Sequence, residues 1–86
     1  MARAIIWHKV KDFDAWKTLY DADKPRRDAA GLTEISINRG KLDSNTLMVE
    51  WETGDPGVME KMMADPELKE TMEKAGVMAM DYFVIQ

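Results

Sequence analysis

Two segments of the sequence, residues 3–10 and 78–85, carry apolar side chains on both of their alternating sides. Neither contains glycine or proline, and both are rich in the β-branched and aromatic residues that favour strands. Successive side chains of a strand point to opposite faces of a sheet. One face therefore receives Ile5, Trp7, Phe83 and Ile85, and the other receives Ile6, Val10, Tyr82 and Val84. A sheet built on these strands has two apolar faces, and each needs a cover.

The segment after the first strand has the pattern of an amphipathic helix. Asp12 is a typical N-cap, and apolar residues recur along one stripe: Phe13, Trp16, Leu19 and Tyr20. Because proline disfavours helix in the preceding residue and lacks an amide donor, Pro25 predicts a kink or restart near Lys24. Gly31 is the expected end of this helical region.

Residues 32–39 and 46–53 alternate as two further strands, joined by a polar turn over residues 40–45. We expect Ile35 and Ile37 to share one face of the first strand. In the second, one face receives Leu47, Val49 and Trp51. Three carboxylates are expected opposite these apolar rows, with Arg39 as an ion-pair partner: Glu34, Glu50 and Glu52. The pattern predicts an antiparallel hairpin.

The stretch between the hairpin and the last strand carries two helix-start signals. Asp55-Pro56 and Asp65-Pro66 both follow the usual order of N-cap and first helical residue, so residues 56–75 should form two short helices end to end. Apolar residues line them, namely Met59, Met62 and Met63 in the first and Leu68, Met72 and Ala75 in the second. Gly76 is the expected C-cap.

The resulting order of strand, helix, strand, strand, helix, strand is the split βαβ arrangement. It predicts an α+β, ferredoxin-like fold, in which a four-stranded antiparallel sheet has helices on one face. The 86 residues fit one domain spanning 1–86, and a domain of this size buries only about 60–65% of its unfolded surface. Because the helices cover one apolar face, a second copy is the simplest cover for the other, and we expect a homodimer.

Three stretches resemble a known group of proteins: VKDFDAWKTLYD, AAGLTEISINRG and MADPELKETMEKAGV. They look like the dimeric α+β barrel superfamily, and most like its small antibiotic biosynthesis monooxygenases and polyketide cyclase-like members. The resemblance implies two sheets face to face in a barrel, with a pocket between helices and sheet in each subunit. Some members oxygenate polycyclic phenols without metal or flavin, and others isomerise lactones, degrade haem or have no assigned activity. The haem-degrading pattern includes a histidine on a helix, whereas His8 lies on the first strand.

Composition narrows the classes of function. The sequence has no cysteine and one histidine, which excludes disulfide frameworks, thiolate metal sites and histidine-rich metal sites, so we expect no cofactor. A net charge of −4 argues against nucleic acid as a partner. We interpret the one basic cluster, Lys24, Arg26 and Arg27, as solvated helix surface. No segment has the ~20 apolar residues of a membrane span and no secretory leader is recognisable, so we expect a cytoplasmic protein without membrane contact.

His8 is the candidate catalytic residue, because histidine is the side chain that exchanges a proton near neutral pH without a large pKa shift. The alternative is a histidine that packs at a strand end or at the dimer edge. The candidate substrate-binding residues are Trp16, Tyr20, Trp51, Tyr82, Met59 and Met72, which offer flat aromatic walls and adaptable filling. The same side chains also suit a packed core.

The sequence is compatible with two functions. One is a small-molecule-binding α+β barrel dimer that acts as a cofactor-independent monooxygenase or cyclase-like enzyme on an apolar or aromatic ring. The other is a non-catalytic dimerisation or stress-associated module. A cavity of roughly a few hundred Å³ beside His8 favours the first, and a filled interior favours the second.

Overall fold

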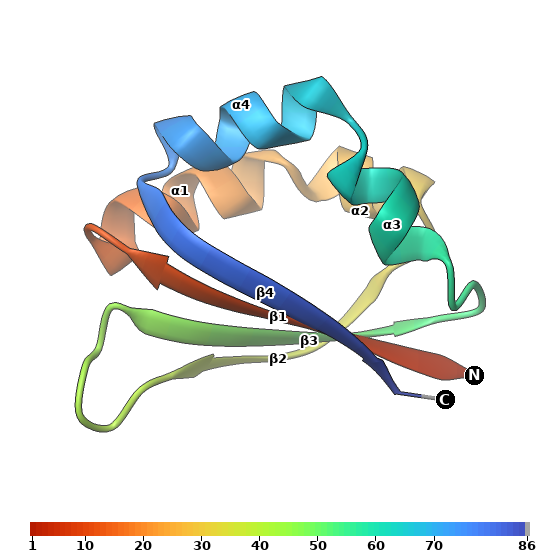
Figure 1. Cartoon of the computed structure of the whole chain (residues 1–86), viewed down its shortest axis with the longest axis horizontal. Helices are drawn as coiled ribbons and strands as arrows, with labels where there is room; N and C mark the ends of the chain where they lie inside the picture. The colour runs from red at the N-terminus through yellow and green to blue at the C-terminus, as the bar shows by residue number, and fades with distance from the viewer. Residues whose placement is uncertain (86) are drawn as a thin grey trace.

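The computed structural model describes residues 1–85 and contains four strands and two pairs of short helices (Figure 1). Along the chain these are β1 (Ala2–Val10), α1 (Phe13–Ala22), α2 (Lys24–Ala29), β2 (Thr33–Arg39), β3 (Thr46–Thr53), α3 (Val58–Met63), α4 (Pro66–Lys74) and β4 (Val77–Ile85). The element order predicted from the sequence is therefore confirmed.

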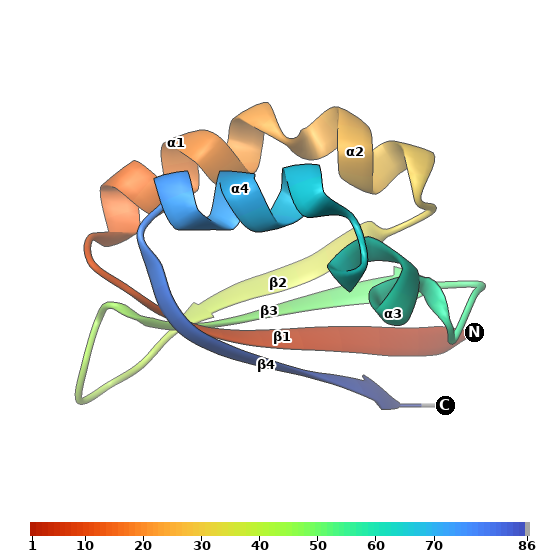
Figure 2. The same ribbon diagram turned by 45° about the horizontal axis from the view of Figure 1, so that its top comes forward.

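The strands form one antiparallel sheet in the order β2-β3-β1-β4. β1 lies in the interior of the sheet, where it pairs with β3 from Ala2↔Thr53 to Lys9↔Thr46 and with β4 along its other edge. All four helices cover the same face of the sheet (Figure 2). This is the ferredoxin-like α+β fold with helices on one face that the sequence predicts.

The hydrophobic core lies between the helices and the covered face of the sheet. The alternation of β1 and β3 sends Ala4, Ile6 and Val10 and the predicted row of Leu47, Val49 and Trp51 toward the helices, where all are buried. From the helices, Trp16 and Met59 complete this cluster. The stripe and row patterns of the sequence therefore identify the core.

The other face of the sheet carries no helix and remains apolar. Phe83 is 52% exposed and Ile85 51%, and Met48 on β3 is 43% exposed. Ile5 and Trp7 lie on the same face and are half-buried by their neighbours. Below, these five residues are called the open sheet face. Arg3 and Glu50 form an ion pair of 2.5 Å on it.

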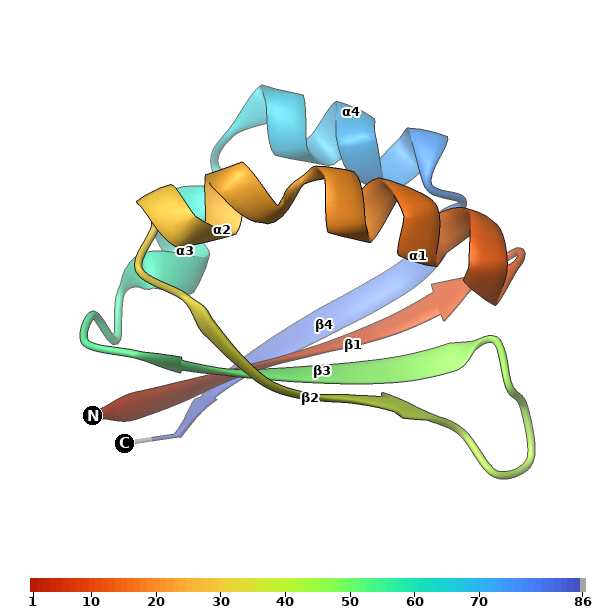
Figure 3. The same ribbon diagram turned by 180° about the vertical axis from the view of Figure 1, so that it is seen from behind.

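The helix boundaries follow local capping. Asp12 accepts a hydrogen bond from the Ala15 amide at 2.9 Å, as an N-cap does. α1 stops before Asp23 and α2 restarts at Lys24, with Pro25 in its first turn, so the predicted break is confirmed (Figure 3). Gly31 and Gly76, with φ of 77° and 82°, end the two helical regions in the left-handed conformation that favours glycine.

One predicted helix start is wrong. α3 begins at Val58 with Gly57 as its N-cap, two residues after the proline expected to open it. The Asp55 carboxylate still organises this turn, because it accepts hydrogen bonds from the Gly57 amide and the Lys61 ammonium. The second signal is correct, since Asp65 accepts from the Glu67 amide and Pro66 opens α4.

The pairing of β2 with β3 contains an irregularity that alternation did not predict. Glu34 pairs with Trp51 and Ser36 with Glu50, so Ile35 is an extra residue between them. Ile35 is consequently exposed while Ile37 packs on the core, and the two do not share a face. The same shift places Glu34 on the helix side, contrary to the prediction.

Arg39 is also placed differently from the expectation. It donates to the Ser44 carbonyl and lies over the ring of Phe13, and the partner of Glu50 is Arg3.

No helix among residues 1–85 is long and apolar enough to cross a membrane.

We predict that Trp16→Ala lowers the free energy of unfolding by about 3–5 kcal/mol, as for other buried large aromatics. Trp16 is 3% exposed and packs against Phe13, Tyr20 and His8. The matched control is Leu42→Ala, in an exposed turn, which should change stability by less than about 0.5 kcal/mol. Urea titration of both variants measures the difference, and a Trp16 effect as small as the control would contradict the assignment of this side chain to the core.

Candidate functional site

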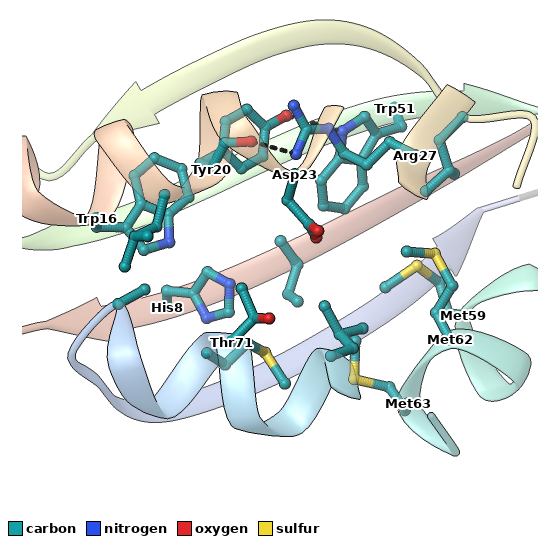
Figure 4. A pocket seen from close by; sticks show the side chains of 16 residues that line it. His8, Trp16, Tyr20, Asp23, Arg27, Trp51, Met59, Met62, Met63 and Thr71 are labelled. Carbon is teal, nitrogen blue, oxygen red and sulfur yellow. Dashed lines mark hydrogen bonds between the residues drawn. The ribbon is translucent and has the colours of Figure 1, made fainter. Parts of the chain in front are cut away.

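A cavity of about 70 Å³ lies beneath the helices, over the covered face of the sheet (Figure 4). Side chains from both helix pairs and from β1 and β3 line it, and most of them are apolar. The lining comprises Ile6, His8, Trp16, Leu19, Tyr20, Asp23, Arg27, Leu32, Trp51, Met59, Met62, Met63, Leu68, Thr71, Met72 and Ala75.

The structure brings together all but one of the side chains proposed from the sequence. His8, Trp16, Tyr20, Trp51, Met59 and Met72 line this one cavity. Tyr82 does not; it pairs with Ile6 across the β1–β4 ladder and packs half-buried against the core beside the cavity. A shared location is a structural fact, and a binding role for these residues stays a prediction.

His8 is positioned by β1, whose alternation directs it inward with Ile6 and Val10. It is 5% exposed, and its ring and that of Trp16 meet in a T-shaped arrangement with their centroids 6.1 Å apart. Burial lowers the pKa of His8 from 6.5 to about 4, because the cationic form loses its hydration. The expectation of a histidine without a large pKa shift is therefore wrong, and the imidazole is neutral at pH 7.

The Nδ1 atom of His8 is buried and has no hydrogen-bond partner among residues 1–85. Leaving a buried polar atom unpaired costs roughly 1–3 kcal/mol. His8 lines the cavity, so a ligand could use this hydrogen-bonding position once a neighbouring side chain moves and opens access to Nδ1.

Tyr20 joins the cavity to the edge of the sheet. Its ring stacks on Trp16 at 4.7 Å between centroids. Its hydroxyl donates to Glu34 Oε1 at 2.8 Å and accepts a hydrogen bond from Trp51 Nε1 at 3.0 Å. Burial raises the pKa of Tyr20 above its usual 10, and the hydrogen bond to Glu34 raises it further. Tyr20 therefore keeps its proton at neutral pH and acts as a hydrogen-bonding group.

Arg27 is a lining residue that the sequence analysis assigned wrongly to solvated surface. It is 8% exposed, with its guanidinium carbon 3.6 Å from the centre of the Tyr20 ring. It donates to the Tyr20 carbonyl oxygen at 2.6 Å. Spacing could have indicated this burial, because Arg27 follows Tyr20 by seven residues, two helical turns along the same stripe.

Asp23, at the break between α1 and α2, extends toward the cavity (Figure 4). Its two carboxylate oxygens accept hydrogen bonds from Arg26 Nε at 3.1 and 3.2 Å. Arg26 also pairs with Asp65 at the start of α4, at 2.5 Å. This ion-pair cluster links the two helix pairs beside the cavity.

Methionines form the α3 and α4 side of the cavity wall, with Met59, Met62 and Met63 from α3 and Met72 from α4. Methionine is unbranched and flexible, so this wall can change shape with little strain. Across residues 1–85, no three metal-ligating side chains come together.

The chain is similar to known proteins in its three-dimensional structure only. No protein-family model and no curated protein sequence matches the chain. A conserved protein from Methanosarcina mazei superposes with a TM-score of 0.71 at 12% identity, covering 99% of this chain and 90% of that one. A NIPSNAP family protein of unknown function from Agrobacterium tumefaciens gives 0.69 at 12% identity, covering 99% and 86%.

SnoaB, a cofactor-independent oxygenase from Streptomyces nogalater, gives a TM-score of 0.70 at 10% identity, covering 99% of this chain and 90% of that one. The fold is thus that of the NIPSNAP and antibiotic biosynthesis monooxygenase structures, over the full length of the chain. The resemblance found in the sequence is confirmed at the level of the fold. Identities this low carry no function across.

We predict that the buried His8 makes stability depend on pH. Its pKa is lower in the folded chain than in the unfolded chain, so the unfolded state binds the extra proton as pH falls from about 6.5 to 4. Stability should therefore drop by about 2 kcal/mol between pH 7 and pH 5 through this residue alone. Urea unfolding at both pH values and one protein concentration measures the drop.

The control for this experiment is His8→Gln, which keeps a polar side chain but does not titrate. Hydrogen bonds hold the pKa values of two carboxyl groups below their usual range: the Asn45 amide donates to Asp43, and Lys61 donates to Asp55. These carboxylates therefore lose their contribution to stability only at a pH below the range of this experiment. An equal drop in wild type and His8→Gln would show that His8 is not the titrating group.

Proposed function

We propose that this protein is a homodimer whose subunits each bind a small molecule with an apolar or aromatic ring in the cavity beneath their helices. One observation carries the proposal: the lining of the cavity combines flat aromatic walls, an adaptable methionine wall and His8, whose buried Nδ1 has no hydrogen-bond partner among residues 1–85. Apolar walls with a few convergent polar groups are typical of ligand sites. Trp16, Tyr20 and Trp51 would contact the ring.

The open sheet face supports the dimer. Its apolar side chains are continuous across β3, β1 and β4, and exposed patches of this kind are typical of interfaces. A second sheet placed against it would bury both faces and close a barrel with the helices outside. The resemblance to dimeric α+β barrels points to the same arrangement.

Catalysis without a cofactor is the finer part of the proposal. His8 would accept the proton of an acidic phenol or enol, and the electron pair of the broken O–H bond would stay on the substrate. The resulting anion would then transfer one electron to molecular oxygen, and the substrate radical and superoxide would combine to form a C–O bond to a peroxide that keeps both oxygen atoms. In a cyclisation, a carbon of the anion would instead attack a carbonyl carbon of its own molecule, whose oxygen would take the electron pair of the broken C=O π bond and the proton from His8. SnoaB, with the same fold, is a cofactor-independent oxygenase, which supports this chemistry by analogy of fold.

A non-catalytic dimerisation module is the second candidate, and the size of the cavity favours it. About 70 Å³ is well below the roughly 300–1,000 Å³ typical of drug-sized ligand pockets. Ring binding therefore requires Met59, Met62 or Met72 to change rotamer and enlarge the space. A module of this class would keep the interior closed and bind no ligand.

We predict a dimer held by the open sheet face. Sedimentation at micromolar concentration should give about twice the chain mass of 9.9 kDa. Phe83→Lys should weaken the dimer at least about 100-fold, because it buries an unpaired charge in the interface. Leu42→Lys, in an exposed turn, is the matched control and should leave the dimer intact. A folded wild-type monomer would exclude the barrel.

We predict that His8→Ala lowers kcat by about 10²–10⁴-fold while the fold and the dimer stay intact, the range for loss of a positioned base. A substrate is first sought among hydroxylated aromatic compounds by oxygen uptake without added metal or flavin. Circular dichroism and sedimentation of the variant are the controls. Normal turnover in a folded variant would refute the role of His8, and loss of folded protein alone would indicate a packing residue.

A further inference from the structure

We propose that the ligand of the cavity is a small acid, whose apolar ring lies against the aromatic and methionine walls and whose carboxylate pairs with Arg27. This inference rests on the proposed ligand-binding function and names the class of ligand. It is carried by the charge of Arg27, which the described part of the protein leaves unpaired.

Arg27 is more than nine-tenths buried, yet no carboxylate among residues 1–85 lies within ion-pair distance of it. Among the described residues, its guanidinium contacts the face of Tyr20 and the carbonyl of the same residue, and Glu34 lines a neighbouring polar pocket with Arg27 without forming an ion pair. A buried charge without a counter-ion is strongly destabilising, so such charges are normally paired. The pairing partner of Arg27 is therefore expected to come from outside the chain.

The other arginines are placed differently. Arg3 pairs with Glu50, Arg26 pairs with Asp23 and Asp65, and Arg39 is exposed. Glu34 approaches the same region, but its carboxylate accepts the Tyr20 hydroxyl and forms no ion pair with Arg27. Of the two charged residues that line the cavity, Asp23 and Arg27, only Arg27 has no ion-pair partner among residues 1–85.

Asp23 also borders the cavity and could attract a cationic ligand instead. Both of its oxygens already accept hydrogen bonds from Arg26, so this carboxylate has an ion-pair partner within the protein. Arg27 uses one N–H for the Tyr20 carbonyl and keeps further donors in its planar fork. A fork of this geometry binds a carboxylate through two parallel hydrogen bonds, which favours a carboxylic acid over a neutral ring.

The size of the cavity limits the acid to about one ring. An apolar cavity of roughly 150 Å³ accommodates benzene. The cavity of this protein reaches that size only if its methionine side chains change rotamer. Benzoate and its uncharged isostere benzamide are therefore suitable probes, because they share the ring and differ in charge.

The test compares the binding of benzoate and benzamide by calorimetry at pH 7, at one ionic strength. Wild type should bind benzoate on the order of 10- to 100-fold more tightly, the range for hydrogen bonds to a charged group. This comparison needs no variant and so does not depend on how Arg27 substitutions fold. Equal binding of both probes would overturn the inference and leave the ligand-binding function standing, whereas no binding of either would overturn both.

Arg27→Gln should abolish the preference for benzoate, and Arg27→Lys should keep part of it through a single charge. Lys24→Gln is the matched control: it makes the same change of charge on the same helix, at an exposed residue that does not line the cavity. The preference should be unchanged there. A preference for benzoate that survives in folded Arg27→Gln would show that another group binds the carboxylate.

Discussion

The structure depends on a single constraint, the need of β1 to bury both of its faces. As an interior strand it has neighbours on both edges, so its side chains can only point up or down. Ile6, His8 and Val10 point toward the helices and are buried there, while Ile5 and Trp7 point to the open sheet face. The same alternation therefore places a histidine at the cavity and an apolar surface on the opposite face of the sheet.

The sequence predicts the fold well because each element has a complete local signal. Alternation of period two marks the strands, and a cap and an apolar stripe mark α1. The irregularity at Ile35 had no such signal, since no glycine accompanies it and the residues on either side alternate normally. One extra residue was enough to move Glu34 to the helix side, where it accepts the Tyr20 hydroxyl. Unbroken alternation predicts the wrong side for Glu34, so this contact at the candidate site could not be predicted from the sequence.

The aromatic and methionine walls could be predicted because side chains on a helical stripe converge on one side. The charges and pKa values of the site could not be predicted from the sequence. Arg27 was assigned to solvent on the general tendency of charged residues, and only the folded arrangement places its guanidinium on the ring of Tyr20. The pKa of His8 likewise depends on how completely Trp16 and its other neighbours exclude water, which no sequence pattern specifies.

Arg27 and His8 together restrict the chemistry that the cavity can support. Proton transfer from an ordinary phenol, with a pKa near 10, to an imidazole with a pKa of about 4 is uphill by about 8 kcal/mol. Attraction between the imidazolium and the new anion recovers part of this in a site that excludes water. Arg27 lines the same cavity, so its guanidinium stabilises an anionic substrate further. The same positive charge destabilises a protonated His8 when no anion is bound. Under the proposed function, the substrate must therefore be more acidic than a simple phenol, and His8 takes its proton only while the anion remains in the cavity.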